Sequence, residues 1–195
     1  MTAPDVLAPL GPVVAALEAL EVQHYIGGSF ASSAHGAPRS TLDVDIVADL
    51  RPEHVERFVE MLSPGFYLDE ARIRDAVDRR RSFNLIHLDS MFKVDIFVSK
   101  GRPFDRSALA RAQHRPLGSD PSGRPVRVAS PEDTVLAKLE WYRAGAETSE
   151  RQWSDILGVL RTKREALDYV YLELQADGLG VRDLLDRAVK EAAQS

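Results

Sequence analysis

The chain has 195 residues, of which 44% are hydrophobic and 28% charged, which suffices for one hydrophobic core or a core with an appended helical unit. It contains no cysteine, which excludes zinc fingers and disulfide frameworks, and its net charge of −5 argues against a basic surface that coats nucleic acid. No apolar run approaches the ~20 residues that span a membrane, and the sequence shows no basic-then-apolar pattern of a leader, so we expect a cytoplasmic protein without a membrane partner.

Charge is unevenly spread along the chain. Residues 66–127 carry 13 basic and 8 acidic side chains, whereas residues 1–65 carry 3 and 9, and residues 128–195 carry 9 and 13. The middle third is therefore where we expect a polyanion to be received.

The first elements lead to a glycine-rich turn. Val6–Leu20 repeats apolar residues at helical spacing, and Val22–Ile26 is a short β-prone run. Gly27, Gly28 and Ser29 then let the backbone turn sharply with exposed N–H groups, which can cradle a phosphate. Ser29 is the predicted N-cap of a short helix that follows.

Two aspartates share one face of the next predicted strand. Asp43 and Asp45 alternate with Val44, Ile46 and Ala48, so the apolar side packs and the acidic side is free. Positions i and i+2 of a strand lie roughly 7 Å apart at Cα, which suits carboxylates that bind one shared cation or a pair of cations. Carboxylates are hard ligands, so the expected cofactor is Mg²⁺ or Mn²⁺.

Residues between the turn and these acids are further candidates. We expect Arg39 and Thr41 to line the same cleft, where Arg39 would meet a phosphate or form a structural pair with Asp43 or Asp45. His35 precedes a Gly-Ala-Pro loop and is expected at the surface.

The middle of the chain adds a third acid. Arg51–Leu62 predicts a second amphipathic helix, and the charge run within Tyr67–Arg81 fits either a solvated helix or loop or a phosphate contact. Residues 82–88 and 92–98 predict a hairpin that places Asp95 beside the first two acids. A carboxylate there needs a cationic partner, either a metal or a neighbouring Arg or Lys.

The last part of the chain predicts one strand and several helices. PVRVAS is a short strand, and Ser130 caps a helix with Pro131 in its first position. Three more amphipathic helices follow, one of them capped by Thr148 or Ser149. Trp141 and Trp153 lie on apolar stripes and are expected in the core.

The order Gly-Gly-Ser, thirteen residues, Asp-Val-Asp and later Val-Asp-Ile-Phe resembles the DNA polymerase beta type nucleotidyltransferase superfamily. The resemblance implies that Asp43, Asp45 and Asp95 hold two divalent ions. It also implies that Gly27, Gly28 and Ser29 hold the phosphates of a nucleoside triphosphate, whose NMP group passes to an acceptor.

The runs SPEDTVLAKLEWYR and SERQWSDILGVL resemble the C-terminal helices of small bacterial nucleotidyltransferases related to the AbiEii toxins. This resemblance marks Lys138 and Asp155 as further site residues. Lys138 would meet the triphosphate or lie at the surface, and Asp155 would orient Lys138 or pair with Arg151.

We therefore expect an α/β fold, a nucleotidyltransferase-like mixed sheet of four or five strands flanked by helices, with a C-terminal helical lobe of about four helices. The expected parts are a core at 1–100, a connecting segment at 101–128 and the helical lobe at 129–195. The expected activity is two-metal nucleotidyl transfer from an NTP, on tRNA, another RNA or a protein, as a toxin-like enzyme with an antitoxin partner. The alternatives are a small-molecule nucleotidyltransferase of the aminoglycoside type and a non-catalytic nucleotide-binding module.

Overall fold

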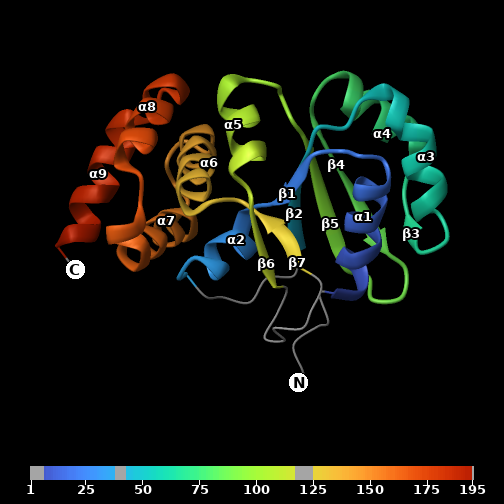
Figure 1. Cartoon of the computed structure of the whole chain (residues 1–195), viewed down its shortest axis with the longest axis horizontal. Helices are drawn as coiled ribbons and strands as arrows, with labels where there is room; N and C mark the ends of the chain where they lie inside the picture. Colours follow the sequence, from blue (N-terminus) through green and yellow to red (C-terminus); the bar gives the residue numbers. More distant parts are fainter. Residues whose placement is uncertain (1–6, 38–42, 117–124, 195) are drawn as a thin grey trace.

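The computed structural model describes residues 7–37, 43–116 and 125–194, which form a seven-stranded mixed sheet with helices around it (Figure 1). The strands are β1 (His24–Ile26), β2 (Asp43–Ala48), β3 (Phe66–Tyr67), β4 (Ser82–His87), β5 (Lys93–Val98), β6 (Gln113–Pro116) and β7 (Pro125–Val128). The helices are α1 (Leu7–Ala19), α2 (Gly28–Ala34), α3 (Pro52–Leu62), α4 (Glu70–Asp78), α5 (Pro103–Arg111), α6 (Pro131–Ala144), α7 (Glu150–Lys163), α8 (Tyr169–Leu179) and α9 (Arg182–Ala193), with the 3₁₀ turn η1 (Arg164–Ala166) after α7.

The sheet has the strand order β3-β4-β5-β2-β1-β7-β6. At its centre β2 and β5 run parallel, and β4 and β5 form the predicted antiparallel hairpin. Val44, Ile46 and Ala48 of β2 are buried, as are Val94 and Ile96 of β5, so one face of these strands belongs to the core. The alternation of apolar and polar residues in the sequence predicts this one-sided burial, because successive side chains of a strand point to opposite faces.

The sheet is larger than the expected four or five strands. Both β3 and β6 are short, and β6 has the polar sequence Gln-His-Arg-Pro, which lacks the alternation that marks a strand. Pairing with β4 and β7 defines them instead, which is a tertiary effect. The segment 101–128 contains α5, β6 and β7, and both of these strands extend the sheet.

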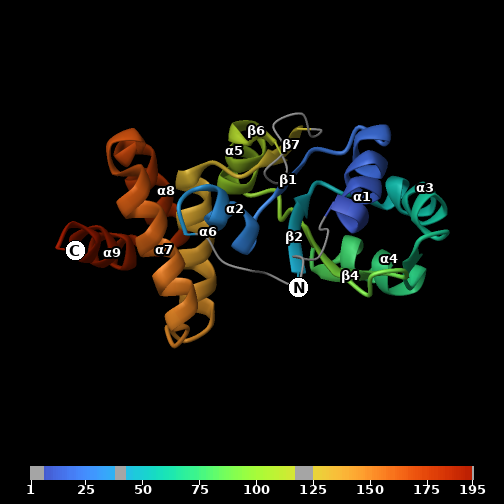
Figure 2. The ribbon, with the colours of Figure 1, turned by 90° about the horizontal axis from the view of Figure 1, so that it is seen from below.

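The helices gather in two groups. Figures 1 and 2 show α1, α3 and α4 at one end of the molecule and α6 to α9 at the other, with α2 and α5 between them. Ser130 caps α6 and Ser149 caps α7, each accepting a hydrogen bond from a backbone N–H of the first turn. Within the described part of the chain, no helix combines the length and the apolar character needed to cross a bilayer.

A buried polar network anchors α6 to α5 and α8. Arg111 donates to Glu132 at 3.1 Å, and the Tyr171 hydroxyl donates to Asp133 at 2.7 Å. The Arg111 guanidinium also lies 4.0 Å from the centre of the Tyr171 ring. Since Glu132 and Asp133 are in the first turn of α6 and are buried, these contacts fix the direction in which α6 leaves β7.

Candidate active site

The three predicted acids lie on the same face of the sheet, on neighbouring strands. In the parallel register of β2 and β5, Asp45 lies opposite Asp95, and Asn84 of β4 continues the same row. Asp43 lies one step away, opposite Lys93. This acidic row joins side chains that are far apart in the sequence, and the pairing of β2 with β5 creates it.

The pKa of Asp45 reflects its burial and the negative charge of this row. Burial is the largest cause that raises its pKa, to about 6, and the negative charges of Asp43 and Asp95 raise it further. The ammonium groups of Lys138 and Lys93 act in the opposite direction and offset only part of the effect. The row therefore holds more negative charge than its neighbours neutralise, which favours binding of a cation.

The glycine turn packs directly against Asp45. The Gly27 N–H donates to the Asp45 carbonyl at 2.8 Å, which ties the turn to β2. Gly28 has a φ of +55°, and a Cβ at this position would lie 1.7 Å from Asp45 Oδ2. Only glycine fits, because a side chain would be strained by the backbone angle and would displace the carboxylate.

The predicted cap of α2 was wrong. The helix begins at Gly28, with Gly27 as its N-cap and no side-chain cap, so Ser29 lies inside the first turn. The backbone N–H groups at the start of a helix have no acceptor within that helix. Gly28, which packs against Asp45, and Ser29 thus offer N–H groups at the start of α2, while the Gly27 N–H is already used.

Lys138 and Asp155 form a buried ion pair between α6 and α7. Their side chains are 9% and 6% exposed, and Lys138 Nζ lies 2.8 Å from Asp155 Oδ2. Lys138 is therefore not the surface lysine that was one alternative. Because its charge also lowers the pKa of Asp45, Lys138 lies within electrostatic reach of the acidic row and connects the helical group to it.

We predict that Lys138→Met destabilises the protein by about 3 kcal/mol or more, because the buried Asp155 carboxylate loses this ammonium. The double variant Lys138→Met/Asp155→Leu should lose less than the sum of the two single variants. Urea unfolding of all three variants measures this coupling.

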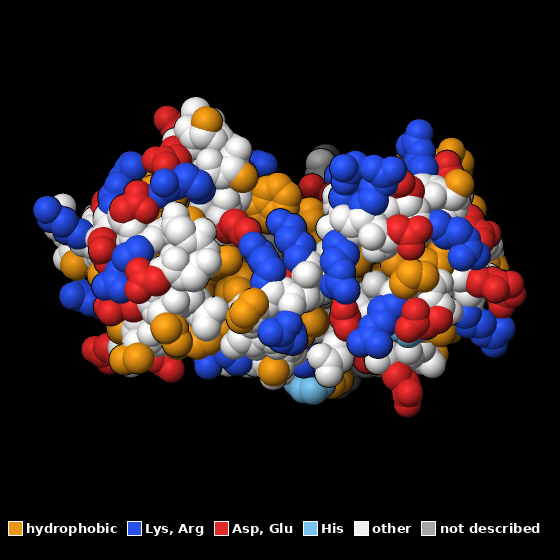
Figure 3. All heavy atoms as spheres, turned by 90° about the horizontal axis from the view of Figure 1, so that it is seen from above, with side chains coloured by type: hydrophobic (Ala, Val, Ile, Leu, Met, Phe, Trp, Pro, Cys, Tyr) orange, Lys and Arg blue, Asp and Glu red, His pale blue; other side chains and the backbone are white. Residues whose placement is uncertain are grey.

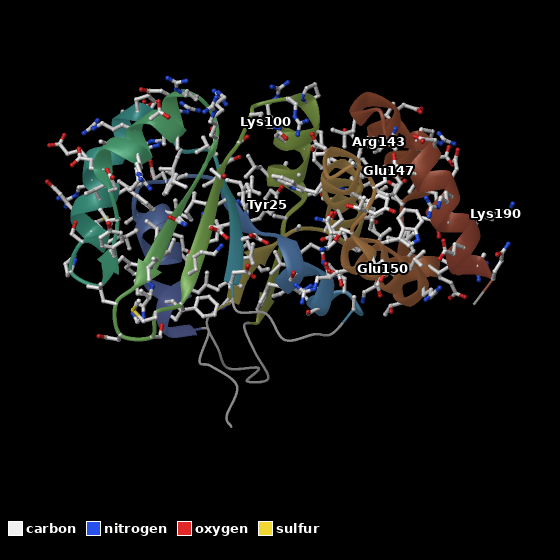
Figure 4. The ribbon with its side chains drawn as sticks, turned by 180° about the vertical axis from the view of Figure 1, so that it is seen from behind. Tyr25, Lys100, Arg143, Glu147, Glu150 and Lys190 are labelled. Atoms are coloured by element: carbon white, nitrogen blue, oxygen red, sulfur yellow. The ribbon has the colours of Figure 1, made fainter. Side chains whose placement is uncertain are left out.

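An exposed pair of similar length provides the control. Arg143 lies at the outer end of α6 (Figure 4) and pairs with Asp183 at 2.7 Å, with side-chain exposures of 40% and 69%. Arg143→Met should cost much less stability than Lys138→Met, since solvent screens an exposed pair. Equal losses from both variants would contradict a special role for the Lys138–Asp155 pair.

The donor set fits a hard divalent cation in its chemistry, with carboxylates on neighbouring positions of paired strands and an excess of negative charge at Asp45. Across the described ranges, no three His, Asp or Glu side chains converge closely enough to hold an ion between them. Asp95 is instead paired with Lys93, whose ammonium lies 2.7 Å from Asp95 Oδ2. A cation shared by the row would compete with Lys93 for Asp95.

Other predicted residues have different outcomes. Arg39 and Thr41 lie outside the described residues. His35 was expected at the surface, but it is fully buried at the end of α2, the helix that packs against α6 and α7, and its Nε2 lies 2.7 Å from the Ala129 carbonyl. Trp153 is in the core as predicted, whereas Trp141 is 55% exposed, because it lies near the end of α6 where the helix emerges from its neighbours.

Sequence reasoning expected a metal, Arg or Lys as the partner of Asp95 without naming Lys93, and it missed Asn84 as a neighbour of the acids. Lys93 stands two residues before Asp95, so the alternation of β5 already places both side chains on one face. Asn84 reaches the row only through the hairpin register, which the turn at Asp89-Ser90 does not reveal.

We compared the sequence and the structure of the chain with those of known proteins. No protein-family model matches the chain, and no curated protein matches it in sequence. An antigenic nucleotidyltransferase-like protein from Paracoccidioides brasiliensis is similar in structure, with a TM-score of 0.54 and 17% identity over 96% of this chain and 94% of that chain. The chain has the nucleotidyltransferase fold.

The antibiotic-resistance factor ANT(2'')-Ia shares this nucleotidyltransferase fold. Its solution structure has a TM-score of 0.53 and 17% identity, over 99% of this chain and 97% of that chain. At such identities the likeness extends to the architecture. The chemistry has to be argued from the acidic row and the glycine turn.

Proposed function

We propose that the protein is a nucleotidyltransferase that moves an NMP group from a nucleoside triphosphate to an acceptor hydroxyl, with release of pyrophosphate and of the hydroxyl proton. The observation that carries this proposal is the contact between the glycine turn and the acidic row, in which Gly28 leaves no room for a side chain beside Asp45. A phosphate held by the first N–H groups of α2 would lie next to the carboxylates that bind its counter-cations.

Each group of residues has a part in this reaction. Gly28 and Ser29 donate backbone hydrogen bonds to phosphate oxygens, and Asp43, Asp45 and Asp95 would hold Mg²⁺ or Mn²⁺. The bound ions supply charge neutralisation of the triphosphate and activation of the attacking oxygen. Lys138 adds positive charge near Asp45, where the triphosphate charge would lie.

The acceptor would approach through a groove that has Asp95 among its lining residues. This groove has a volume of ≈ 720 Å³, and its walls come from β3, α4, β4 and Asp95 of β5, including Tyr67, Arg72 and Asn84. A volume of this order suits a small molecule. We therefore favour a polar small molecule with a free hydroxyl as the acceptor, positioned so that Asp95 accepts the hydrogen bond of that hydroxyl.

RNA is the second candidate acceptor. Figure 3 shows Lys and Arg side chains gathered over α5 and α4, in agreement with the positive middle third of the sequence. Arg72, Arg74 and Arg79 of this region are paired with acids of α4 or its cap, which reduces the charge that remains for a polyanion. A toxin-like role with an antitoxin partner would depend on RNA or a protein as the acceptor.

Labelled NTPs test the proposal. The purified protein is incubated with Mg²⁺, each NTP labelled at the α-phosphate, and either a set of aminoglycosides and other hydroxylated small molecules or total RNA. Label in a small molecule, lost in Asp45→Asn, is the expected result. Label only in RNA would overturn the small-molecule acceptor and retain the transferase. If no acceptor is labelled, the proposed enzymatic activity is overturned, and a non-catalytic nucleotide-binding module remains as the alternative.

A further inference from the structure

Trp141 is an exposed aromatic side chain on the helix that also carries Lys138. Its ring meets the ring of Phe97 edge to face, with centroids 5.6 Å apart and an interplanar angle of 70°. Its exposed fraction is 55% although α6 is otherwise buried over most of its length. The indole is thus held by Phe97 while part of its surface stays accessible, and a ligand that covered the ring would add hydrophobic stabilisation.

The aromatic pair borders the acidic row. Phe97 follows Asp95 by two residues on the same face of β5, about 7 Å away at Cα. On α6, Trp141 follows Lys138 by three residues, which is about one helical turn. The side chain of Tyr25 in β1 lies on the side of the sheet that faces α5 and α6 (Figure 4). Val47 of β2 pairs with Tyr25 on one side and with Phe97 on the other, so these three residues form one row across the sheet. An apolar row therefore runs directly beside the acidic one.

We propose that Trp141, held in place by Phe97, stacks on the base of the nucleoside triphosphate. This inference rests on the proposed function and assigns the base subsite of the same site. A nucleotide whose phosphates lie at Gly28 and Asp45 would pass Lys138 and reach Trp141 with its base. Every base offers a flat π-face to an indole, so such a platform binds the base without reading its identity.

The acceptor is a poorer occupant for this surface. The groove that includes Asp95 is otherwise lined from β3, α4 and β4, and neither Trp141 nor Phe97 is among its lining residues. Trp141 approaches β5 from α6, the helix whose Lys138 acts on Asp45. The nucleotide and the acceptor would thus approach Asp95 from different sides, with the base of the nucleotide against α6 and the acceptor against α4.

Intrinsic fluorescence gives a direct test, because the chain has two tryptophans. Trp153 is 8% exposed and donates its indole N–H to Glu191 at 3.0 Å, so it is shielded from a ligand. In Trp153→Phe the emission reports Trp141 alone. We expect a non-hydrolysable ATP analogue with Mg²⁺ to quench this emission, and Mg²⁺ with tripolyphosphate to leave it unchanged. In the variant Trp141→Phe, which keeps Trp153, the ATP analogue should no longer quench the emission.

Calorimetric titration gives the second readout. Trp141→Ala should raise the Kd of the ATP analogue by about tenfold, while the Kd of tripolyphosphate stays the same. Trp141→Phe should restore most of the affinity, since a phenyl ring still stacks. Arg143→Ala, an exposed change on the same helix, should leave both affinities unchanged.

The outcomes separate this inference from the function on which it rests. If the ATP analogue and tripolyphosphate bind equally well and Trp141→Ala changes neither Kd, the stacking site is overturned and the phosphate site stands. Quenching of Trp141 by an acceptor molecule and not by the nucleotide would also overturn it. If neither phosphate ligand binds, the proposed function fails, and the base subsite fails with it.

Discussion

Asp45→Asn is expected to abolish nucleotidyl transfer and, in the absence of metal, to stabilise the protein at neutral pH. Loss of a metal ligand removes several kcal/mol of transition-state stabilisation, which corresponds to about 10³-fold or more in turnover. The same change removes a carboxylate that burial and the charges of Asp43 and Asp95 make unfavourable. Activity and stability should therefore move in opposite directions.

The pH dependence of stability follows from the pKa of Asp45, which is about 6 in the folded protein against an ordinary value of 3.8. At pH values well below 3.8 the group is protonated in both states and contributes nothing. As the pH rises to about 6, the unfolded chain has released this proton while the folded protein retains it, so stability falls. The full penalty, on the order of 3 kcal/mol, is present above that pH.

Urea unfolding with EDTA at pH 4 and at pH 7.5 measures this difference. The Asn variant should exceed the wild type only slightly at the lower pH and by much more at the higher one. Asp49→Asn is the control, because Asp49 follows β2 and pairs with Arg51 at 3.2 Å outside the acidic row. It should keep turnover and show no such gain. Wild-type turnover of Asp45→Asn in Mg²⁺ would refute the proposed role of the row.

Gly28→Ala should abolish nucleotide binding with the smallest possible change. The new methyl group would lie 1.7 Å from Asp45 Oδ2 and 2.6 Å from Asp45 Cγ, so the carboxylate must move out of the row. The φ of +55° adds about 1 kcal/mol or more of backbone strain for a residue with a Cβ. Gly28→Val should have the same effect, with more strain because valine is β-branched.

Calorimetric titration with a non-hydrolysable NTP analogue and Mg²⁺ tests this prediction. Gly27→Ala serves as a control for stability, because Gly27 has a φ of −114° and an added Cβ would meet only Tyr25 Cε2, at 3.6 Å. It should unfold at nearly the wild-type temperature, whereas Gly28→Ala should unfold at a lower one. Unchanged nucleotide affinity in a folded Gly28→Ala variant would move the phosphate site away from this turn.

Most of the regular elements near the site could be predicted from the sequence. The alternation in Asp43–Ala48 and Lys93–Val98 indicates both strands and the face on which the acids lie. The start of α6 at Ser130-Pro131 follows from cap chemistry. These signals are local, since each depends on a few neighbouring residues and on the fixed period of a strand or helix.

The sequence by itself determined the glycine turn, the strands that carry Asp43, Asp45 and Asp95, and the helical character of the last third. Tertiary structure alone decided the burial of His35, the exposure of Trp141 and the pairing of Lys138 with Asp155. The physical reason is that burial and ion pairing depend on which elements pack together. Local periodicity tells which face of a helix is apolar, whereas the position of α6 among α2, α7, α8 and α9 tells where that face ends.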